Sequence, residues 1–133
     1  RGVGFSRANL FGQDFEAYRA EAQCPLLVAM IENRRALGEL DSILAVQGVD
    51  ALLIGPYDLS ASLGLIAQFD HPEFVGAMEA ILSRAKARNV PLGIHVVEPS
   101  REQLNRRIGE GYIFLAYSID SVMLSRSAQL PDR

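Results

Sequence analysis

The chain has 133 residues, of which 49% are hydrophobic and 22% are charged, and its formal net charge is −3. This length is enough for one domain with a real core, and the composition excludes a disordered chain. The small negative charge argues against nucleic acid as the main partner. No apolar run reaches the roughly 18 residues that span a bilayer, and no signal peptide is visible, so we expect no membrane partner.

The single cysteine, Cys24, excludes an intrachain disulfide and fits the reducing cytoplasm, where we expect the protein to work. Because Cys24 directly precedes Pro25 and an apolar run, we expect a buried structural thiol rather than a nucleophile. The sequence begins at Arg1 and not at Met. We therefore expect a fragment or a processed product, with residues 1–133 forming a single domain.

Residues 1–9 are rich in glycine and are predicted to be irregular, because glycine allows backbone conformations that are closed to other residues. Ser6, Arg7 and Asn9 are candidate contacts for an anion. The alternative, which we favour, is a plain surface loop.

Apolar runs and helical periodicities alternate along the rest of the chain. The predicted strands cover residues 26–32, 51–54, 90–95 and 112–117. The predicted helices cover residues 15–22, 34–46, 72–88, 99–109 and 121–129, with a short helix or turn at 59–65. This alternation predicts an α/β fold with a parallel sheet, and four βα units are half of an eight-stranded barrel. A half-barrel leaves two open strand edges and one exposed inner face.

Polar residues mark several of the predicted helix starts. Asn33 and Ser100 are placed to cap the helices that follow them. His71 directly precedes Pro72, so we interpret it as a helix-start residue. Asp120 follows the fourth strand and is expected to cap the last helix.

Two of the predicted strands lead directly to a carboxylate. Glu32 ends the first strand, and Asp58 follows the second strand after a Gly-Pro break. Because ligands of α/β folds bind at the carboxyl ends of parallel strands, both carboxylates are candidate metal ligands on one rim. Two carboxylates with open positions suit Mg²⁺ or Mn²⁺. From position alone, the alternative is that both are surface residues at loop starts.

His95 falls at the end of the third predicted strand, on the same rim. It is a candidate contact for substrate or for a metal-bound water. A hydrogen-bonded structural histidine is the alternative.

Four segments carry a resemblance to a known family. They are Arg-Gly-Val-Gly at 1–4, Ile-Glu-Asn at 31–33, Gly-Pro-Tyr-Asp-Leu-Ser at 55–60 and Tyr-Ser-Ile-Asp at 117–120. In this order they resemble the carboxyl-terminal half of the HpcH/HpaI aldolases, class II pyruvate aldolases related to citrate lyase beta-type enzymes. The resemblance extends over nearly the whole chain, and the segment at 55–60 is its most specific part.

The resemblance implies a TIM (β/α)₈ barrel, of which this chain is the second half. It also implies a homo-oligomer, usually a hexamer of barrels that exchange their last helices. Glu32 and Asp58 would hold a divalent metal, with Mg²⁺, Mn²⁺ and Co²⁺ as candidates. The backbone around Tyr57 and Asp58 would contact the carboxylate of pyruvate.

The reaction implied by the resemblance is the cleavage of a 4-hydroxy-2-oxo acid to pyruvate and an aldehyde. The metal binds the keto and carboxylate oxygens and stabilises the pyruvate enolate, which is Lewis-acid catalysis of a developing oxyanion. The expected substrates are 2-keto-3-deoxy sugar acids or related dicarboxylates.

The sequence departs from the family pattern in two ways. Met30 stands where many members carry a glutamine, which removes a polar contact. The catalytic histidine and the oxyanion-stabilising arginine of the family belong to earlier strands, and Arg1 lies in a later motif. We therefore assign no catalytic residue, and we expect the isolated chain to lack the full catalytic set.

Two other functions stay open. A lyase of the same superfamily that acts on a CoA thioester is one, although the sequence offers no extended basic groove for CoA. The other is a catalytically incomplete half-barrel that acts by association through its open edges.

Overall fold

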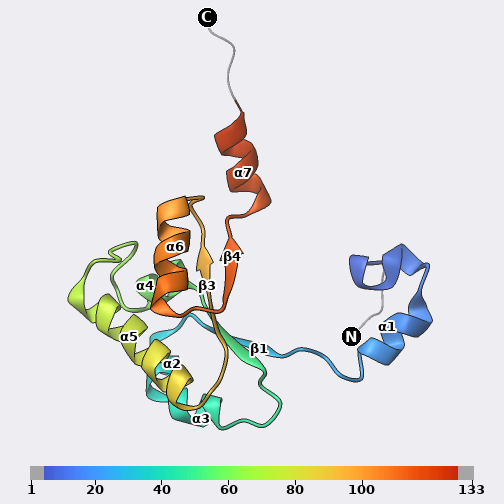
Figure 1. The fold of residues 1–133 in the computed structure, drawn as a ribbon, viewed down its shortest axis with the longest axis horizontal. Coiled ribbons are helices and arrows are strands. Elements are labelled where there is room, and N and C mark those ends of the chain that lie inside the picture. Colours follow the sequence, from blue (N-terminus) through green and yellow to red (C-terminus); the bar gives the residue numbers. More distant parts are fainter. Residues whose placement is uncertain (1–4, 129–133) are drawn as a thin grey trace, which may run out of the picture.

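The computed structural model describes residues 5–128 and contains one sheet of four parallel strands. The strands are β1 (Val28–Ile31), β2 (Ala51–Ile54), β3 (Leu92–Val96) and β4 (Phe114–Tyr117). They lie side by side in sequence order, and a helical segment follows each of them (Figure 1). This confirms the predicted α/β fold of four βα units. The glycine-rich residues 1–4 and the end of the predicted last helix at residue 129 lie outside the described residues.

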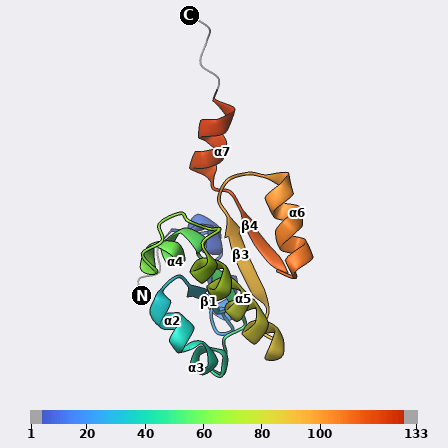
Figure 2. The same ribbon diagram turned by 90° about the vertical axis from the view of Figure 1, so that its left-hand side faces the viewer.

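Helices cover one face of the sheet (Figures 1 and 2). The covering helices are α2 (Arg34–Gly38), α3 (Leu40–Leu44), α4 (Pro56–Ser62), α5 (Pro72–Ala87) and α6 (Arg101–Glu110). The 3₁₀ helix η1 (Arg7–Gly12) and helix α1 (Phe15–Glu21) lie on the other side of the sheet, and α7 (Asp120–Ser127) projects beyond the end of β4. Between residues 5 and 128, no helix has the length and apolar character that crossing a membrane requires.

The hydrophobic core lies between the sheet and the covering helices. Ile31, Ile54 and Ile94 are neighbours in one row across β1, β2 and β3, and none is more than 1% exposed. The helices add Leu40, Leu44, Leu59, Phe74, Met78 and Ile81 to this core. Since alternate residues of a strand point to opposite faces, the row of isoleucines assigns the intervening strand residues to the open face.

The open face of the sheet is also largely apolar. Met30, Leu53, Gly93 and Phe114 are neighbours in the adjacent row, and Met30 is 53% exposed. The ring of Phe114 occupies the space that a Cβ at Gly93 would need. Strands with apolar residues on both faces are typical of parallel sheets that are covered on both sides. This face corresponds to the exposed inner face expected of half a barrel.

The helix predicted over residues 34–46 is divided in two. α2 ends at Gly38 and α3 begins at Leu40, with Glu39 between them at φ −103° and ψ 12°. Glycine is among the weakest helix formers, which explains why the break falls beside Gly38. The apolar side chains of both α2 and α3 still contact the core, as the helical spacing of the sequence predicts.

The N-terminal segment is more ordered than predicted. Residues predicted to be irregular begin η1, and Asn9 is only 1% exposed. The Asn9 Oδ1 accepts hydrogen bonds from the backbone N–H groups of Ser6 and Gly12, each at 3.0 Å. The side chain of Asn9 therefore stabilises a local turn, as an asparagine that bonds nearby backbone often does.

The prediction for Cys24 is wrong, because this thiol is exposed. Cys24 lies in the segment between α1 and β1, where every residue from 21 to 28 is exposed. The apolar run that follows it was interpreted as a buried strand from residue 26, but β1 begins only at Val28.

Most predicted helix caps are confirmed. The side chains of Asn33, His71 and Ser100 accept hydrogen bonds from backbone N–H groups at the starts of α2, α5 and α6. Asp120 is different, because Ile119 takes the N-cap position and Asp120 is the first residue of α7. The Asp120 Oδ1 instead accepts a bond from the N–H of Ser121 at 2.7 Å.

Two glycines give opposite predictions for the same substitution. Gly76 lies inside α5 with no atom within 4 Å of the place where a Cβ would stand. Gly76→Ala should raise the free energy of unfolding by about 0.5 to 1 kcal/mol, because alanine is the better helix former. Gly111 ends α6 at φ +100°, a conformation that alanine adopts only with strain. Gly111→Ala should therefore lower the free energy of unfolding by about 1 kcal/mol or more. Urea unfolding of both variants measures the two signs, and a loss for Gly76→Ala would contradict the first.

Candidate functional site

Glu32 lies at the carboxyl end of β1, directly after the buried Ile31. Its side chain is exposed and lies across from Gly55, the residue that follows β2. A Cβ at position 55 would stand 3.3 Å from the Cβ of Glu32, 3.4 Å from its Oε2 and 3.7 Å from the Sδ of Met30. The absence of a side chain at Gly55 therefore lets the side chains of Glu32 and Met30 lie close to the backbone there.

Asp58 lies on the same edge of the sheet, one strand further along. Helix α4 begins at Pro56, immediately after β2, with Gly55 at its N-cap position. Asp58 is in the first turn of this helix and is exposed. The prediction had placed this helix or turn later, at residues 59–65. The early start follows from Pro56, since proline is favoured at the first position of a helix.

The two chain segments that carry these carboxylates are tied together. The backbone N–H of Arg34 donates to the Oγ of Ser62 at 2.8 Å, which joins the start of α2 to the end of α4. The backbone N–H of Gly55 also donates to the carbonyl of Ile31 at 3.2 Å. Neighbouring strands are about 4.8 Å apart. Glu32 directly follows β1 and Asp58 lies in the first helical turn after β2, so both carboxylates are on the same edge of the sheet.

Neither carboxylate is neutralised by the protein. In the part of the chain from residue 5 to 128, Glu32 and Asp58 take part in no ion pair and their side chains accept no hydrogen bond. Residues 5–128 also contain no group of three or more histidine, cysteine, aspartate or glutamate side chains that could hold a metal ion. Two exposed carboxylates without a partner among these residues fit a hard divalent cation that keeps its other positions for water and substrate.

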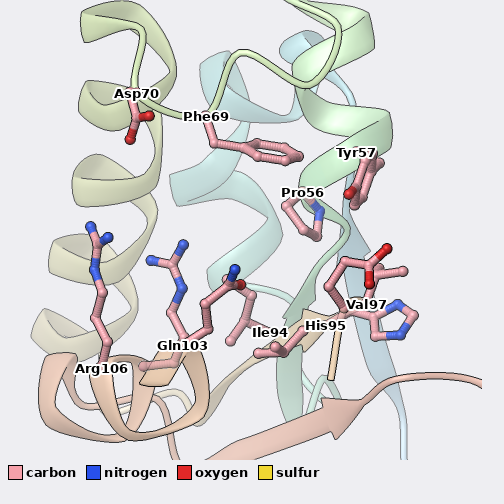
Figure 3. Close-up of a pocket in the computed structure, with 12 residues that line it drawn as sticks. Pro56, Tyr57, Phe69, Asp70, Ile94, His95, Val97, Gln103 and Arg106 are labelled. Atoms are coloured by element: carbon pink, nitrogen blue, oxygen red, sulfur yellow. The ribbon is translucent and has the colours of Figure 1, made fainter. Parts of the chain in front are cut away.

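Tyr57 lies between these carboxylates and an aromatic cluster. Its ring meets Phe69 edge to face, with centroids 4.9 Å apart (Figure 3). Phe69 in turn meets Phe74, with centroids 5.4 Å apart. The buried Ser60 supports this arrangement: its Oγ donates to the carbonyl of Tyr57 at 2.7 Å and accepts from the N–H of Ala67 at 3.1 Å. The sequence alone gives no sign of this role of Ser60, because the bond to Ala67 depends on the folded loop.

His95 lies within β3 and pairs with Ala116 of β4. It shares its row and face of the sheet with Gly55, since the preceding residues of the two strands are paired. The Nε2 of His95 lies 3.2 Å from the carbonyl oxygen of Ser118. Because a carbonyl oxygen only accepts, Nε2 carries a proton and donates to it, and in the neutral imidazole the acceptor is then Nδ1. The structural hydrogen bond is therefore present, and one ring nitrogen is left for another partner.

Ser118 links β4 to α7 in an unusual conformation. Its φ is +60°, its side chain is buried, and its Oγ has no hydrogen-bond partner among the described residues. The backbone N–H of Ser118 donates to the carbonyl of Val96 at 2.7 Å, which fixes the conformation from the strand side. Two unfavourable features thus coincide at the residue that His95 contacts.

Ser118→Gly should stabilise the protein by about 1 kcal/mol. Glycine removes both the left-handed strain and the unpaired hydroxyl, while its greater freedom in the unfolded chain offsets part of the gain. Ser118→Ala removes the hydroxyl and keeps the strain, so it should gain less. Thermal unfolding of both variants gives the comparison, and a loss of stability for Ser118→Gly would mean that the hydroxyl has an essential partner.

A cavity of about 240 Å³ opens beside the candidate site. Tyr57 and His95 contribute to its wall on one side, and Gln103 and Arg106 reach into it from α6 (Figure 3). Glu32 and Asp58 do not line this cavity. Glu32 belongs instead to the row of the open face of the sheet.

Comparisons with known proteins agree with this arrangement. The family model HpcH/HpaI aldolase/citrate lyase matches residues 8–126. A pyruvate aldolase of Rhizobium etli is 39% identical over 130 residues, which are 97% of this chain and 50% of that protein. A 5-keto-4-deoxy-D-glucarate aldolase of Citrobacter koseri is 34% identical over 134 residues, covering 99% of this chain and 51% of that protein.

The solved structures give the same result. An HpcH/HpaI aldolase/citrate lyase family protein from Burkholderia cenocepacia superimposes with a TM-score of 0.76 and 31% identity, over 96% of this chain and 49% of that one. The chain thus spans about half the length of the relatives it matches. On the match to most of its residues and the identity to these relatives, the chain belongs to the HpcH/HpaI aldolase/citrate lyase family.

Proposed function

We propose that the protein to which this chain belongs is a divalent-metal-dependent class II aldolase. It cleaves a 4-hydroxy-2-oxo acid, such as a 2-keto-3-deoxy sugar acid or a related dicarboxylate, to pyruvate and an aldehyde. One observation carries the proposal: two carboxylates, Glu32 and Asp58, follow adjacent strands of a family member and have no ion-pair partner among residues 5–128.

Glu32 and Asp58 are the proposed metal ligands. Two carboxylates on the same edge of the sheet provide the oxygen ligands that a hard divalent cation prefers. Mg²⁺, Mn²⁺ and Co²⁺ are the candidates. The cation, when bound, supplies Lewis-acid stabilisation of the negative charge that develops on the substrate's oxo oxygen.

The start of α4 is the proposed contact for the substrate carboxylate. The first backbone N–H groups of a helix have no partner within the helix, and those of Tyr57 and Asp58 belong to the first turn of α4. They lie on the same segment as the Asp58 carboxylate. A 2-oxo acid that contacts this turn with its carboxylate would therefore keep its oxo oxygen on the side of the proposed ligands.

His95 is proposed as a substrate contact on the aldehyde side. Its Nε2 is committed to the Ser118 carbonyl, so only Nδ1 is available, and Nδ1 accepts a hydrogen bond. A hydroxyl group of the substrate is the type of donor that suits it. A contact of this kind is made equally in the bound substrate and in the transition state. His95→Phe should therefore raise KM for the substrate more than it lowers kcat.

Metal removal tests the proposal. Full-length protein treated with EDTA and freed of it should lose pyruvate release from a 4-hydroxy-2-oxo acid, and Mg²⁺, Mn²⁺ or Co²⁺ should restore it. The loss arises because the charge on the oxo oxygen is no longer stabilised. Pyruvate is followed continuously with lactate dehydrogenase and NADH. Full activity in the presence of excess EDTA would overturn the metal-dependent assignment.

A further inference from the structure

Helices α5 and α6 both pack against β3 but leave a groove between them. Two cavities, of about 240 and 260 Å³, share Phe69, Arg106 and Arg107 in their walls. The first opens beside Tyr57 and His95, and the second continues along α5. Together they form what we call the α5–α6 groove, whose first cavity reaches the proposed substrate contacts Tyr57 and His95 and whose walls include neither Glu32 nor Asp58.

The two walls of the α5–α6 groove differ in chemistry. The α5 wall presents the apolar side chains of Phe74, Met78 and Leu82. The α6 wall presents the side chains of Arg106, Arg107 and Glu110. An apolar wall that faces a charged one suits a ligand with an apolar body and one polar end.

The charges on the α6 wall leave an excess of positive charge. The Glu110 carboxylate accepts from the Nε of Arg106 at 2.9 Å and from the Nη1 of Arg107 at 2.8 Å. Burial alone would raise the pKa of Glu110, but the bonds to both arginines lower it below its ordinary value, so Glu110 is ionised at neutral pH. Two guanidinium groups thus share one carboxylate, and each has further N–H donors.

The carboxylates at the rim restrict the charge of a ligand. Glu79 lies on the α5 side of the groove and Asp70 at its other end, and no ion pair within residues 5–128 neutralises either. Glu98 also lines the first cavity, but it is paired with Arg126. A dianion lying across the groove would meet one of them. A single negative charge placed at the two arginines avoids this repulsion.

Tyr112 provides a further polar group. Its side chain lines the groove, only 4% of the residue is exposed, and its hydroxyl makes no hydrogen bond with the described residues. Burial raises the pKa of Tyr112 to about 12, so the hydroxyl is neutral and able to donate. Among the described residues, only the Ser118 Oγ is a buried side-chain atom without a partner, so the Tyr112 hydroxyl has access to solvent and can donate to a group in the groove.

We propose that the α5–α6 groove is a second binding site, for a small organic monoanion with an apolar body. The anionic group contacts Arg106 and Arg107, and the apolar body lies on Met78 and Leu82. The Tyr112 hydroxyl donates to an acceptor atom of the ligand. This site differs in chemistry from the proposed aldolase site, which binds short polar oxo acids through carboxylates and a cation.

The three methionines of the chain allow the test to be made on full-length protein with ¹³C-methyl-methionine labelling. Met78 lies in the groove wall, Met30 beside Glu32 and Met123 on α7. Titration with 3-phenylpropanoate should shift the Met78 methyl signal saturably and leave those of Met30 and Met123 in place. Mn²⁺ should broaden the Met30 signal, which reports on the metal site independently of the groove. Substitution of each methionine by leucine assigns the signals.

Three controls identify the recognised groups. Acetate lacks the apolar body and 3-phenylpropanol lacks the charge, so neither should shift Met78 at the same concentration. Arg106→Gln should weaken 3-phenylpropanoate binding about five- to tenfold. Arg101→Gln changes an arginine of the same helix outside both cavities and should leave binding unchanged.

Two results would overturn the groove proposal. One is a Met78 signal that 3-phenylpropanoate does not move in protein whose Met30 signal still responds to Mn²⁺. The other is equal binding of 3-phenylpropanol, which would show that the arginines recognise no charge. Loss of the Mn²⁺ response alone would count against the metal site and not against the groove.

Discussion

Glu32→Gln and Asp58→Asn are each expected to lower kcat/KM for pyruvate release by about a thousandfold or more. Each change keeps the size of the side chain and removes one of only two proposed protein ligands of the cation. Lewis-acid stabilisation of an oxo oxygen is worth several kcal/mol, and each 1.4 kcal/mol corresponds to about a factor of ten in rate. The measurement is the steady-state rate of the full-length variants at saturating Mg²⁺ or Mn²⁺.

Stability measurements separate this effect from unfolding. Without metal, both variants should unfold at the same temperature as the unsubstituted protein or slightly above it, because an unpaired negative charge has been removed. Added Mn²⁺ should stabilise only the unsubstituted protein, since ligands stabilise the state that binds them. Glu102→Gln, which changes an exposed carboxylate of α6, is the matched control and should behave as unsubstituted. Full activity in both ligand variants would rule out the assignment.

Phe74→Ala is expected to lower the free energy of unfolding by about 3 to 5 kcal/mol. Phe74 is 2% exposed in the first turns of α5, and its ring packs on Phe69 as well as on the core. Replacing a buried aromatic side chain by alanine loses its transfer energy and leaves a cavity. The whole domain has only about 5 to 15 kcal/mol of stability, so this loss is a large part of it. Urea unfolding gives the difference directly.

The neighbouring residue provides the control for Phe74. Val75 lies one position further along α5 and is 39% exposed. Val75→Ala should therefore change the free energy of unfolding by less than about 1 kcal/mol. If both variants lost the same small amount, α5 would not be packed on the sheet as described.

The sheet was predictable because its signals are local. The run at 51–54 is apolar at every position and is ended by Gly-Pro, and β2 covers the same four residues. Asn33 and Ser100 identify helix starts through bonds to residues two or three positions away. Element boundaries are predicted less well where no turn residue marks them. β1 begins two residues later than predicted, and Leu26 and Leu27 are exposed despite their hydrophobicity.

The candidate site was predictable only in part. Glu32 and Asp58 could be placed on one edge, since the carboxyl ends of parallel strands lie together. The close approach of the Glu32 side chain to Gly55 could not be found, because it depends on contact between segments 23 positions apart. The bond between His95 and the Ser118 carbonyl also joins distant segments, across the β3–β4 pair. Cys24 shows the converse error, where an apolar neighbour was mistaken for burial.

The strand order β1-β2-β3-β4 has a consequence for how the chain folds. Within residues 5–128, β2, β3 and β4 each pair with the strand that precedes them in the sequence, so none of these three pairings waits for a distant segment. Each pairing then closes only a short loop and costs little conformational entropy. Folding is therefore faster than in sheets whose neighbouring strands are far apart in the sequence. During synthesis, each βα unit can join the growing sheet as it leaves the ribosome, and the last strand added always offers the edge for the next.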